Sequence, residues 1–141
     1  MVSDVLLTFV LTVLGGVLIY VLGQITLKFF IEPVHELLLE IGKIGDVLIF
    51  YANVYTNKVD AEKHTKANEA LRQHASLLKA KKHLVKWHSL FAFFGFIPGK
   101  ESIHEAHAEL IGISNSTPRN SSDCVANMRK RQHIEKLLKL A

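Results

Sequence analysis

The stretch that decides the fold is Val5–Leu27, VLLTFVLTVLGGVLIYVLGQITL, which contains no charged side chain. A helix of this length reaches about 35 Å at about 1.5 Å per residue, enough to cross a hydrocarbon core about 30 Å thick. No Lys or Arg precedes the run and no small-residue cleavage pattern follows Tyr20, which argues against a signal peptide. The rest of the chain is too short to wrap such a helix on all sides. We therefore expect a membrane-spanning helix.

The small and polar residues of this run share one side of the expected helix. At about 100° per residue they fall within about a third of its circumference. This packing stripe consists of Thr8, Thr12, Gly15, Gly16, Gly23 and Thr26. Small residues let helix backbones approach closely in lipid, so the stripe predicts self-association. Two alternatives stay open: Gly is also frequent in spanning helices in general, and in an oligomeric pore the stripe would line the lumen.

The charge distribution predicts the orientation of the chain. All 17 Lys and Arg residues follow Leu27, and the net charge is +4 with His neutral. The positive-inside rule therefore places the N-terminus outside and the C-terminal part in the cytoplasm. The single cysteine, Cys124, allows no intramolecular disulfide, which agrees with a reducing compartment.

After the anchor, the apolar spacing predicts a small bundle of about four helices and an all-α fold, with no strand alternation or hairpin turn. Pro33 cannot donate a backbone hydrogen bond, so we expect a new helix or a sharp bend there. The first bundle helix, 33–56, has apolar residues at nearly heptad spacing and Glu40 on its opposite, polar face. Its apolar sector is wide, which predicts neighbours on more than one side; the widening residues are Leu39, Val47, Phe50 and Val54.

Three more helices complete the expected bundle. The second spans 60–86 after a polar turn at 56–60, and its expected inner face consists of Ala67, Leu71, His74, Ala75, Leu78 and Val85. The pattern Ser102-x-x-Glu105 is a capping box that predicts a helix start. A polar linker at 114–122 precedes a thinly apolar helix at 123–140, which we expect to fray or to dock on a partner. The expected organisation is a flank 1–4, an anchor 5–31, a helical domain 32–116 and a basic tail 117–141.

The segment Ser89–Gly99 changes character sharply, because Phe91, Phe93, Phe94 and Phe96 crowd into it before Pro98. One interpretation is a turn that plugs the core between two helices. The other is a dip into the lipid interface beside the anchor, which the neighbouring Trp87 and lysines favour.

No pattern in the chain supports catalysis, a cofactor or a metal. His104-x-x-His107 places two imidazoles on one helix face, but its spacing differs from a zincin helix and a third ligand is missing. Cys124 lacks the surroundings of a nucleophile, and the spacing from Arg129 to His133 fits an RNase motif poorly. No phosphate-binding glycine loop occurs. We therefore expect no enzymatic activity, no cofactor and no metal site.

Basic residues form the most informative polar feature. The expected basic face consists of Lys79, Lys81, Lys82, Lys86, Arg129, Lys130 and Arg131. Three interpretations compete: attraction to anionic lipid, binding of nucleic acid, and an ordinary solvated surface. Nucleic-acid binding is not favoured, because aromatic side chains are not interleaved with the charges except near Trp87.

Several blocks of the chain together resemble a group of small bacterial proteins with one N-terminal membrane helix and a helical cytoplasmic region. The blocks are Phe29–Pro33, Phe50–Val54, Leu71-Arg72 with Ala75-Ser76, Ser89–Phe91 and Leu110–Ser116. The resemblance covers about residues 15–116 and implies a single-pass protein of the bacterial inner membrane; it brings no activity and no functional residues. The leading hypothesis is a non-enzymatic, self-associating protein that presents its bundle to lipid or to a cytoplasmic protein. The alternatives are a small oligomeric pore linked to stress or phage defence, and a membrane-tethered nucleic-acid binder.

Overall fold

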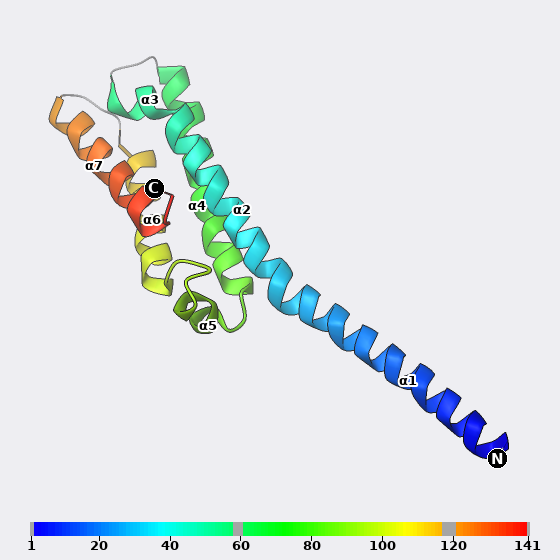
Figure 1. The fold of residues 1–141 in the computed structure, drawn as a ribbon. Coiled ribbons are helices and arrows are strands. Elements are labelled where there is room, and N and C mark those ends of the chain that lie inside the picture. Colours follow the sequence, from blue (N-terminus) through cyan, green and yellow to red (C-terminus); the bar gives the residue numbers. More distant parts are fainter. Residues whose placement is uncertain (1, 58–60, 117–120, 141) are drawn as a thin grey trace.

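The computed structural model describes residues 2–57, 61–116 and 121–140, and every regular element in these ranges is a helix. The elements are α1 (Val2–Thr26), the π-helical turn η1 (Leu27–Ile31), α2 (Glu32–Phe50), α3 (Ala52–Thr56), α4 (Ala61–Leu84), α5 (His88–Phe93), α6 (Lys100–Ser114) and α7 (Ser121–Leu137). Figure 1 shows α1 projecting away from a compact group formed by the other helices. The predicted all-α fold with one long apolar helix at its N-terminus is confirmed.

The anchor and the first bundle helix are continuous. The helix runs from Ser3 to Phe50 without a break, so the separate new helix expected at Pro33 is wrong. In η1 the chain forms a wider turn, in which the Glu32 N–H bonds to the Leu27 carbonyl five residues back. A proline ring clashes with the carbonyl four residues before it, and a wider turn just ahead of Pro33 relieves this crowding.

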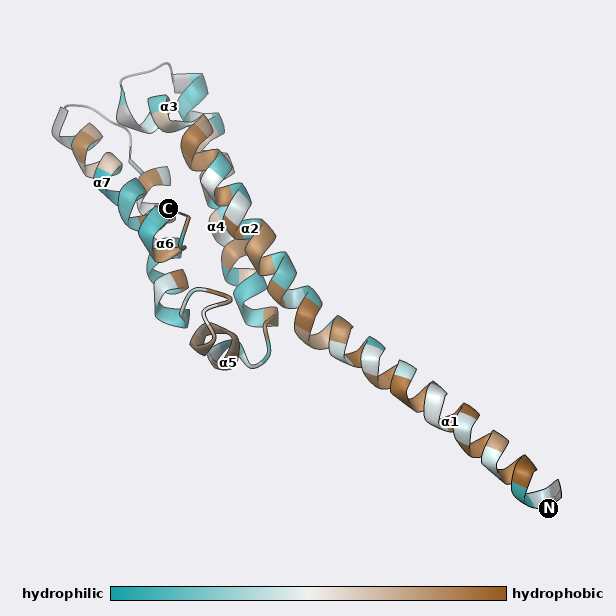
Figure 2. Ribbon diagram, in the orientation of Figure 1, coloured by the Kyte–Doolittle hydropathy of each residue, from teal (hydrophilic) through white to brown (hydrophobic). Residues whose placement is uncertain are grey.

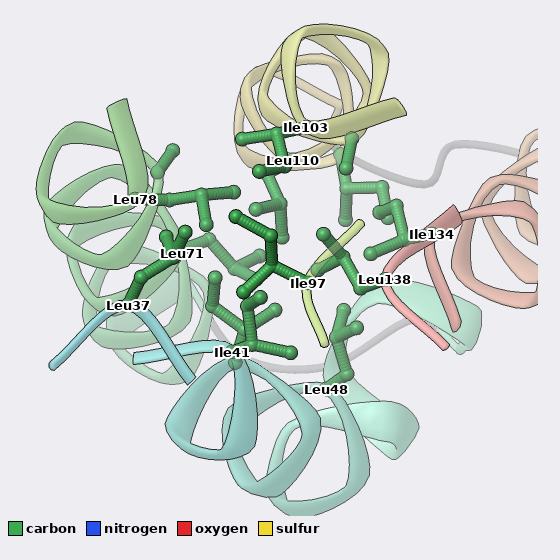
Figure 3. Packing of buried hydrophobic residues seen from close by; sticks show 14 of the residues in the cluster. Leu37, Ile41, Leu48, Leu71, Leu78, Ile97, Ile103, Leu110, Ile134 and Leu138 are labelled. Carbon is green, nitrogen blue, oxygen red and sulfur yellow. The ribbon is translucent and has the colours of Figure 1, made fainter. Parts of the chain in front are cut away.

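Four helices, α2, α4, α6 and α7, surround one hydrophobic core. In Figure 3 they face each other around Ile97, which enters the centre from the loop after α5. The predicted inner residues of α4 are confirmed as buried, except His74, which is half-buried. The core residues share nearly complete burial and come from every helix of the bundle: Leu37, Ile41, Ile44, Leu48, Tyr55, Leu71, Ala75, Leu78, Val85, Ile97, Ile103, Ala106, Leu110, Ile113, Ile134 and Leu138.

The outer side of α2 carries no covering helix among the described residues. Val54 is buried and Val47 packs against the core, as expected, but Leu39 and Phe50 are exposed. The prediction of neighbours on more than one side is therefore wrong for this part of α2. Figure 2 shows brown, apolar bands among teal ones along α2.

Two predictions about helix ends need correction. The helix expected to start at Ser102 begins at Lys100 instead, and its N-cap is Gly99, whose extended backbone ends the preceding loop. No side-chain hydrogen bond caps this helix, so the capping box is not formed. Residues 58–60 of the predicted polar turn and 117–120 of the predicted linker lie outside the described residues, as does the predicted boundary between 116 and 117.

The C-terminal helix belongs to the bundle, so the expectation that it frays or waits for a partner is wrong. Ile134 and Leu138 are buried in the common core. The Asn127 side-chain amide, itself buried, donates a hydrogen bond of 2.9 Å to the backbone carbonyl of Tyr55 in α3. The Tyr55 hydroxyl in turn bonds to the Leu48 carbonyl. A few buried residues at helical spacing thus suffice to fix α7.

Candidate functional site

The apolar surface of α1 is uncovered. The most apolar 18-residue window of the long helix Ser3–Phe50 is 0% buried. Among the described residues this is the one helix that is long and apolar enough to cross a membrane, judged by length and composition. The threonine hydroxyls on α1 donate to carbonyls four residues back: Thr8 to Asp4 and Thr12 to Thr8 at 2.8 Å, and Thr26 to Leu22 at 2.9 Å. Their protons are therefore satisfied within the helix, which lowers the cost of placing them in hydrocarbon.

The glycines of the packing stripe are also uncovered within the described chain. A Cβ atom built on Gly15, Gly16 or Gly23 would meet no atom within 4 Å. No other part of the described chain therefore packs against the three glycines. The stripe residues lie together on α1, and the surface between them is open to a second helix.

The π-helical turn aligns this stripe with the outer side of α2. A π turn acts as a one-residue insertion in an α-helix. We set Thr8 at 0° and count about 100° per residue, subtracting one residue for η1, so that the stripe covers about −20° to 80°. On this scale Gly42 and Ile49 of α2 fall at about 60° and 40°. The core residues of α2, such as Leu37 and Ile44, fall at about −80° and −100° on the same scale. On this count the uncovered side of α2 overlaps the sector of the stripe, which also includes Gly45, a neighbour of Leu140 in the bundle.

The aromatic segment after α4 both plugs the core and exposes side chains. Ile97 is buried and Phe91 packs against the core, which confirms the plug interpretation for these two residues. The remaining aromatic side chains of this segment point outward; they are Trp87, Phe93, Phe94 and Phe96. Figure 1 places α5 at the end of the bundle from which α1 emerges.

Ring contacts fix this segment to the exit of the anchor. The rings of Phe30 and Trp87 meet edge to face with centroids 5.3 Å apart. The Lys86 ammonium lies 5.1 Å from the centre of the Phe29 ring, within range of a cation–π interaction. Trp87 has a left-handed backbone with φ of 59°, a conformation that is uncommon for a bulky residue. The chain thus turns sharply at Trp87 and directs α5 back under the bundle.

His88, the first residue of α5, is buried without a polar partner. Its side chain is 2% exposed, and neither ring nitrogen has a hydrogen bond within the part of the chain that the structure describes. Burial lowers the pKa of His88 below its usual 6.5, and the nearby ammonium groups of Lys100 and Lys82 lower it further. His88 is therefore neutral at pH 7 and is a buried, uncharged side chain at the start of α5.

The expected basic face is divided between two sides of the bundle. Lys79, Lys81 and Lys82 lie on α4 and Lys86 just after it, whereas the remaining three members, Arg129, Lys130 and Arg131, lie on α7. These two helices stand on opposite sides of the core (Figure 3). Three members form ion pairs: Lys81 with Glu36 at 3.6 Å, Lys130 with Glu109 at 3.9 Å, and Arg131 with Glu135 at 2.8 Å. Lys79, Lys82 and Lys86 remain as the basic group nearest to α5, whereas Arg129 is exposed on α7.

Histidine and carboxylate side chains gather between α6 and α7 without forming a metal site. His133 lies 3.7 Å from a Glu105 oxygen and 3.9 Å from a Glu109 oxygen, distances of loose ion pairs. His104 is exposed, and burial, with smaller contributions from Lys79, His104 and Lys82, lowers the pKa of His107. Within the described ranges, no three His, Cys, Asp or Glu side chains are placed to hold a metal ion.

One polar contact was not anticipated. Glu40 is 1% exposed, and its carboxyl oxygen lies 2.7 Å from Nδ1 of His74 on α4. The sequence pattern had placed Glu40 on the polar face of its helix, which is wrong. The inner position predicted for His74 was the available signal, because a histidine directed toward a core needs a polar neighbour.

The comparisons with known proteins add no assignment to this geometry. No protein-family model matches the chain, and no curated protein and no solved structure matches it.

Proposed function

We propose that this chain is a non-enzymatic interaction protein that α1 anchors in a membrane, with self-association along the packing stripe. The single observation that carries the proposal is the complete exposure of an apolar helix beside a bundle that packs its own core. Soluble monomers rarely expose contiguous apolar patches above a few hundred square ångströms. A surface of this extent therefore calls for lipid, a neighbouring helix, or both.

Self-association is supported by the open stripe and by its alignment with α2. In lipid, contact between helices depends on close packing at small residues, because apolar side chains are already solvated by the acyl chains. Along α1 a second copy can approach the stripe without meeting the bundle, because the three stripe glycines contact no other part of the described chain. Beyond the membrane, the same sector of α2 offers Leu38 and Ile49 to the partner copy.

The proposed location is the bacterial inner membrane with the bundle in the cytoplasm. This sidedness rests on the lysines and arginines, all of which follow the anchor. Lys81 and Lys86 lie near the anchor exit, against Glu36 and Phe29, and suit anionic lipid, which contributes about 1 kcal/mol per basic residue close to the surface. The bundle would present its remaining surface to a cytoplasmic protein.

The experiment compares two double substitutions in α1 of the full chain, expressed in a bacterial membrane. Thr12→Leu/Gly16→Leu fills the stripe, whereas Val13→Phe/Val17→Phe adds bulk to another side of the helix. All three proteins should resist extraction with alkaline carbonate, because α1 stays apolar. Chemical crosslinking should give dimers or larger species for the unmodified chain and the valine variant, and monomers for the stripe variant.

Two outcomes would contradict the proposal. Extraction of the unmodified chain by carbonate would remove the anchor, and persistent crosslinking of the stripe variant would remove the predicted interface. Ion leakage from vesicles that contain the unmodified chain would instead favour the pore alternative, in which the stripe faces water.

A further inference from the structure

We infer that the segment Trp87–Ile97 is a second membrane contact, whose exposed aromatic side chains enter the interfacial layer of the bilayer that α1 crosses. The inference rests on the proposed insertion of α1 and adds a second site to it. It assigns an occupant, the lipid headgroup region, to an aromatic surface that the bundle leaves open. It also predicts that the bundle lies against the membrane instead of hanging free from a single helix.

The depth of the segment follows from its contacts with the anchor. Trp87 packs on Phe30, and Lys86 lies over Phe29. These two partners lie two and three residues beyond Leu27, where the apolar run ends, which corresponds to about 3–5 Å along the helix. The interfacial layer is about 5–8 Å thick on each side of the hydrocarbon core. The aromatic segment is therefore held at the level of the headgroups by α1 itself.

The chemistry of the segment matches this layer. Phe93 is 83% exposed, and Phe94 and Phe96 are each 63% exposed, so together they offer a continuous aromatic surface. No Asp or Glu occurs between Glu69 and Glu101, whereas lysines flank the segment on both sides. Aromatic rings beside lysines are typical of segments that lie in the interface of anionic membranes. A protein partner would need to reach the same narrow zone beside the anchor, where lipid is already present.

The backbone of the segment is suited to the interfacial layer of the bilayer, which contains water but is partly apolar. The Phe96 N–H bonds to the Phe91 carbonyl and the Gly95 N–H to the Ala92 carbonyl, each at 3.0 Å. Gly95 adopts a positive φ of 79°, which permits the tight turn that separates Phe94 from Phe96. Most polar groups of the turn are thus satisfied internally, and Ile97 fixes the turn to the core. The turn that carries the exposed rings is therefore fixed to the bundle.

The test uses single-tryptophan proteins, because Trp87 is the only tryptophan in the chain. In the full chain with Trp87→Phe, one new tryptophan is introduced by Phe9→Trp in α1, Phe93→Trp in α5, or Phe50→Trp at the far end of α2. Phe50 is a matched control, since it is 79% exposed but lies near α3, away from the anchor. Each protein is reconstituted in vesicles of phosphatidylcholine and phosphatidylglycerol with bromine either near the glycerol end or near the middle of the acyl chains.

We expect three distinct quenching profiles. Phe9 lies about 10 Å from the centre of the apolar run at about 1.5 Å per residue, so the Phe9→Trp protein should lose fluorescence with both bromine positions. The Phe93→Trp protein should lose fluorescence with shallow bromine only, and the Phe50→Trp protein with neither. If Phe93→Trp behaves like Phe50→Trp while Phe9→Trp is quenched, the second contact is wrong and the anchor stands. If Phe9→Trp also escapes quenching, the proposed membrane insertion fails, and the inference fails with it.

Discussion

α1 and the core-facing side of α2 are two parts of one continuous helix, yet their apolar side chains have opposite surroundings. Leu37, Ile44 and Leu48 on α2 are fully buried by α4, α6 and α7, whereas the central window of α1 is fully exposed. Both parts are rich in leucine, isoleucine and valine, so hydrophobicity alone does not separate them. The difference lies in the pattern: α2 has an apolar side and a side with charged residues, whereas α1 is apolar around most of its circumference. The one-sided apolar surface of α2 is covered by protein, and the all-round apolar surface of α1 is the one that the proposed membrane would cover.

The largest expected effect comes from a matched pair of leucine truncations in the two parts of the helix. Leu48→Ala should lower the free energy of unfolding of the bundle by about 2–5 kcal/mol, because it leaves a cavity in a close-packed core. Leu18→Ala should leave that free energy unchanged, since Leu18 contacts no part of the bundle. Urea unfolding of the full chain in detergent micelles, followed by circular dichroism, measures both. Equal shifts of the two midpoints would refute the division of the helix into covered and uncovered parts.

A smaller effect is expected at the polar contact that joins α2 to α4. His74→Leu leaves the Glu40 carboxyl buried without its hydrogen bond, which should cost about 1–3 kcal/mol, or more if the group is charged. The double variant Glu40→Leu/His74→Leu removes both polar groups and should recover most of this loss. The same urea experiment reports both values. If the double variant is as unstable as the sum of the two single variants, the two side chains are not coupled.

The smallest expected effect is a change in the free energy of unfolding with pH, which arises from histidines of the bundle and not from α1. The folded state lowers the pKa of His88, so the unfolded chain binds a proton more readily. The free energy of unfolding should therefore fall as the pH drops below about 6.5, by at most about 1.4 kcal/mol per pH unit for one group, down to the folded pKa. His107 contributes in the same direction. His88→Leu should reduce the slope without abolishing it, while membrane retention of the chain stays constant.

Thermal unfolding at several pH values between 5 and 7.5 provides the measurement. An unchanged slope in the His88→Leu variant would show that His88 stays solvated in the folded state. A loss of membrane attachment over the same range would place a titrating group in the anchor.

The sequence pattern predicted the elements better than their contacts. The spacing of Leu71, Ala75 and Leu78 identified the inner face of α4, because a helix with one apolar side has only one way to bury it. Glu40 and Phe50 were misplaced, because their burial depends on which neighbours α2 meets and not on α2 itself. The start of α6 was misjudged by two residues, since Gly99 follows Pro98 and ends the loop before Ser102 can act as a cap.

The sequence alone indicated the packing stripe but not the contacts of the aromatic segment. The packing stripe follows from helical periodicity, because its successive members are at most seven residues apart in one helix. The aromatic contact with the anchor joins Phe30 to Trp87, residues far apart in the chain, and no local pattern encodes that distance. The alignment of the stripe with the outer side of α2 likewise depends on the extra residue in η1.

The sequence by itself determined that this chain has one long apolar helix and a small all-helical remainder, because periodicity and the absence of charge act within single helices. The tertiary structure decided that Pro33 does not interrupt the long helix, that α7 completes the core, and that Trp87 packs against Phe30 where the apolar helix enters the bundle. These features arise from packing between segments distant in the chain. Such packing depends on the shapes that meet in space, which no single stretch of sequence specifies.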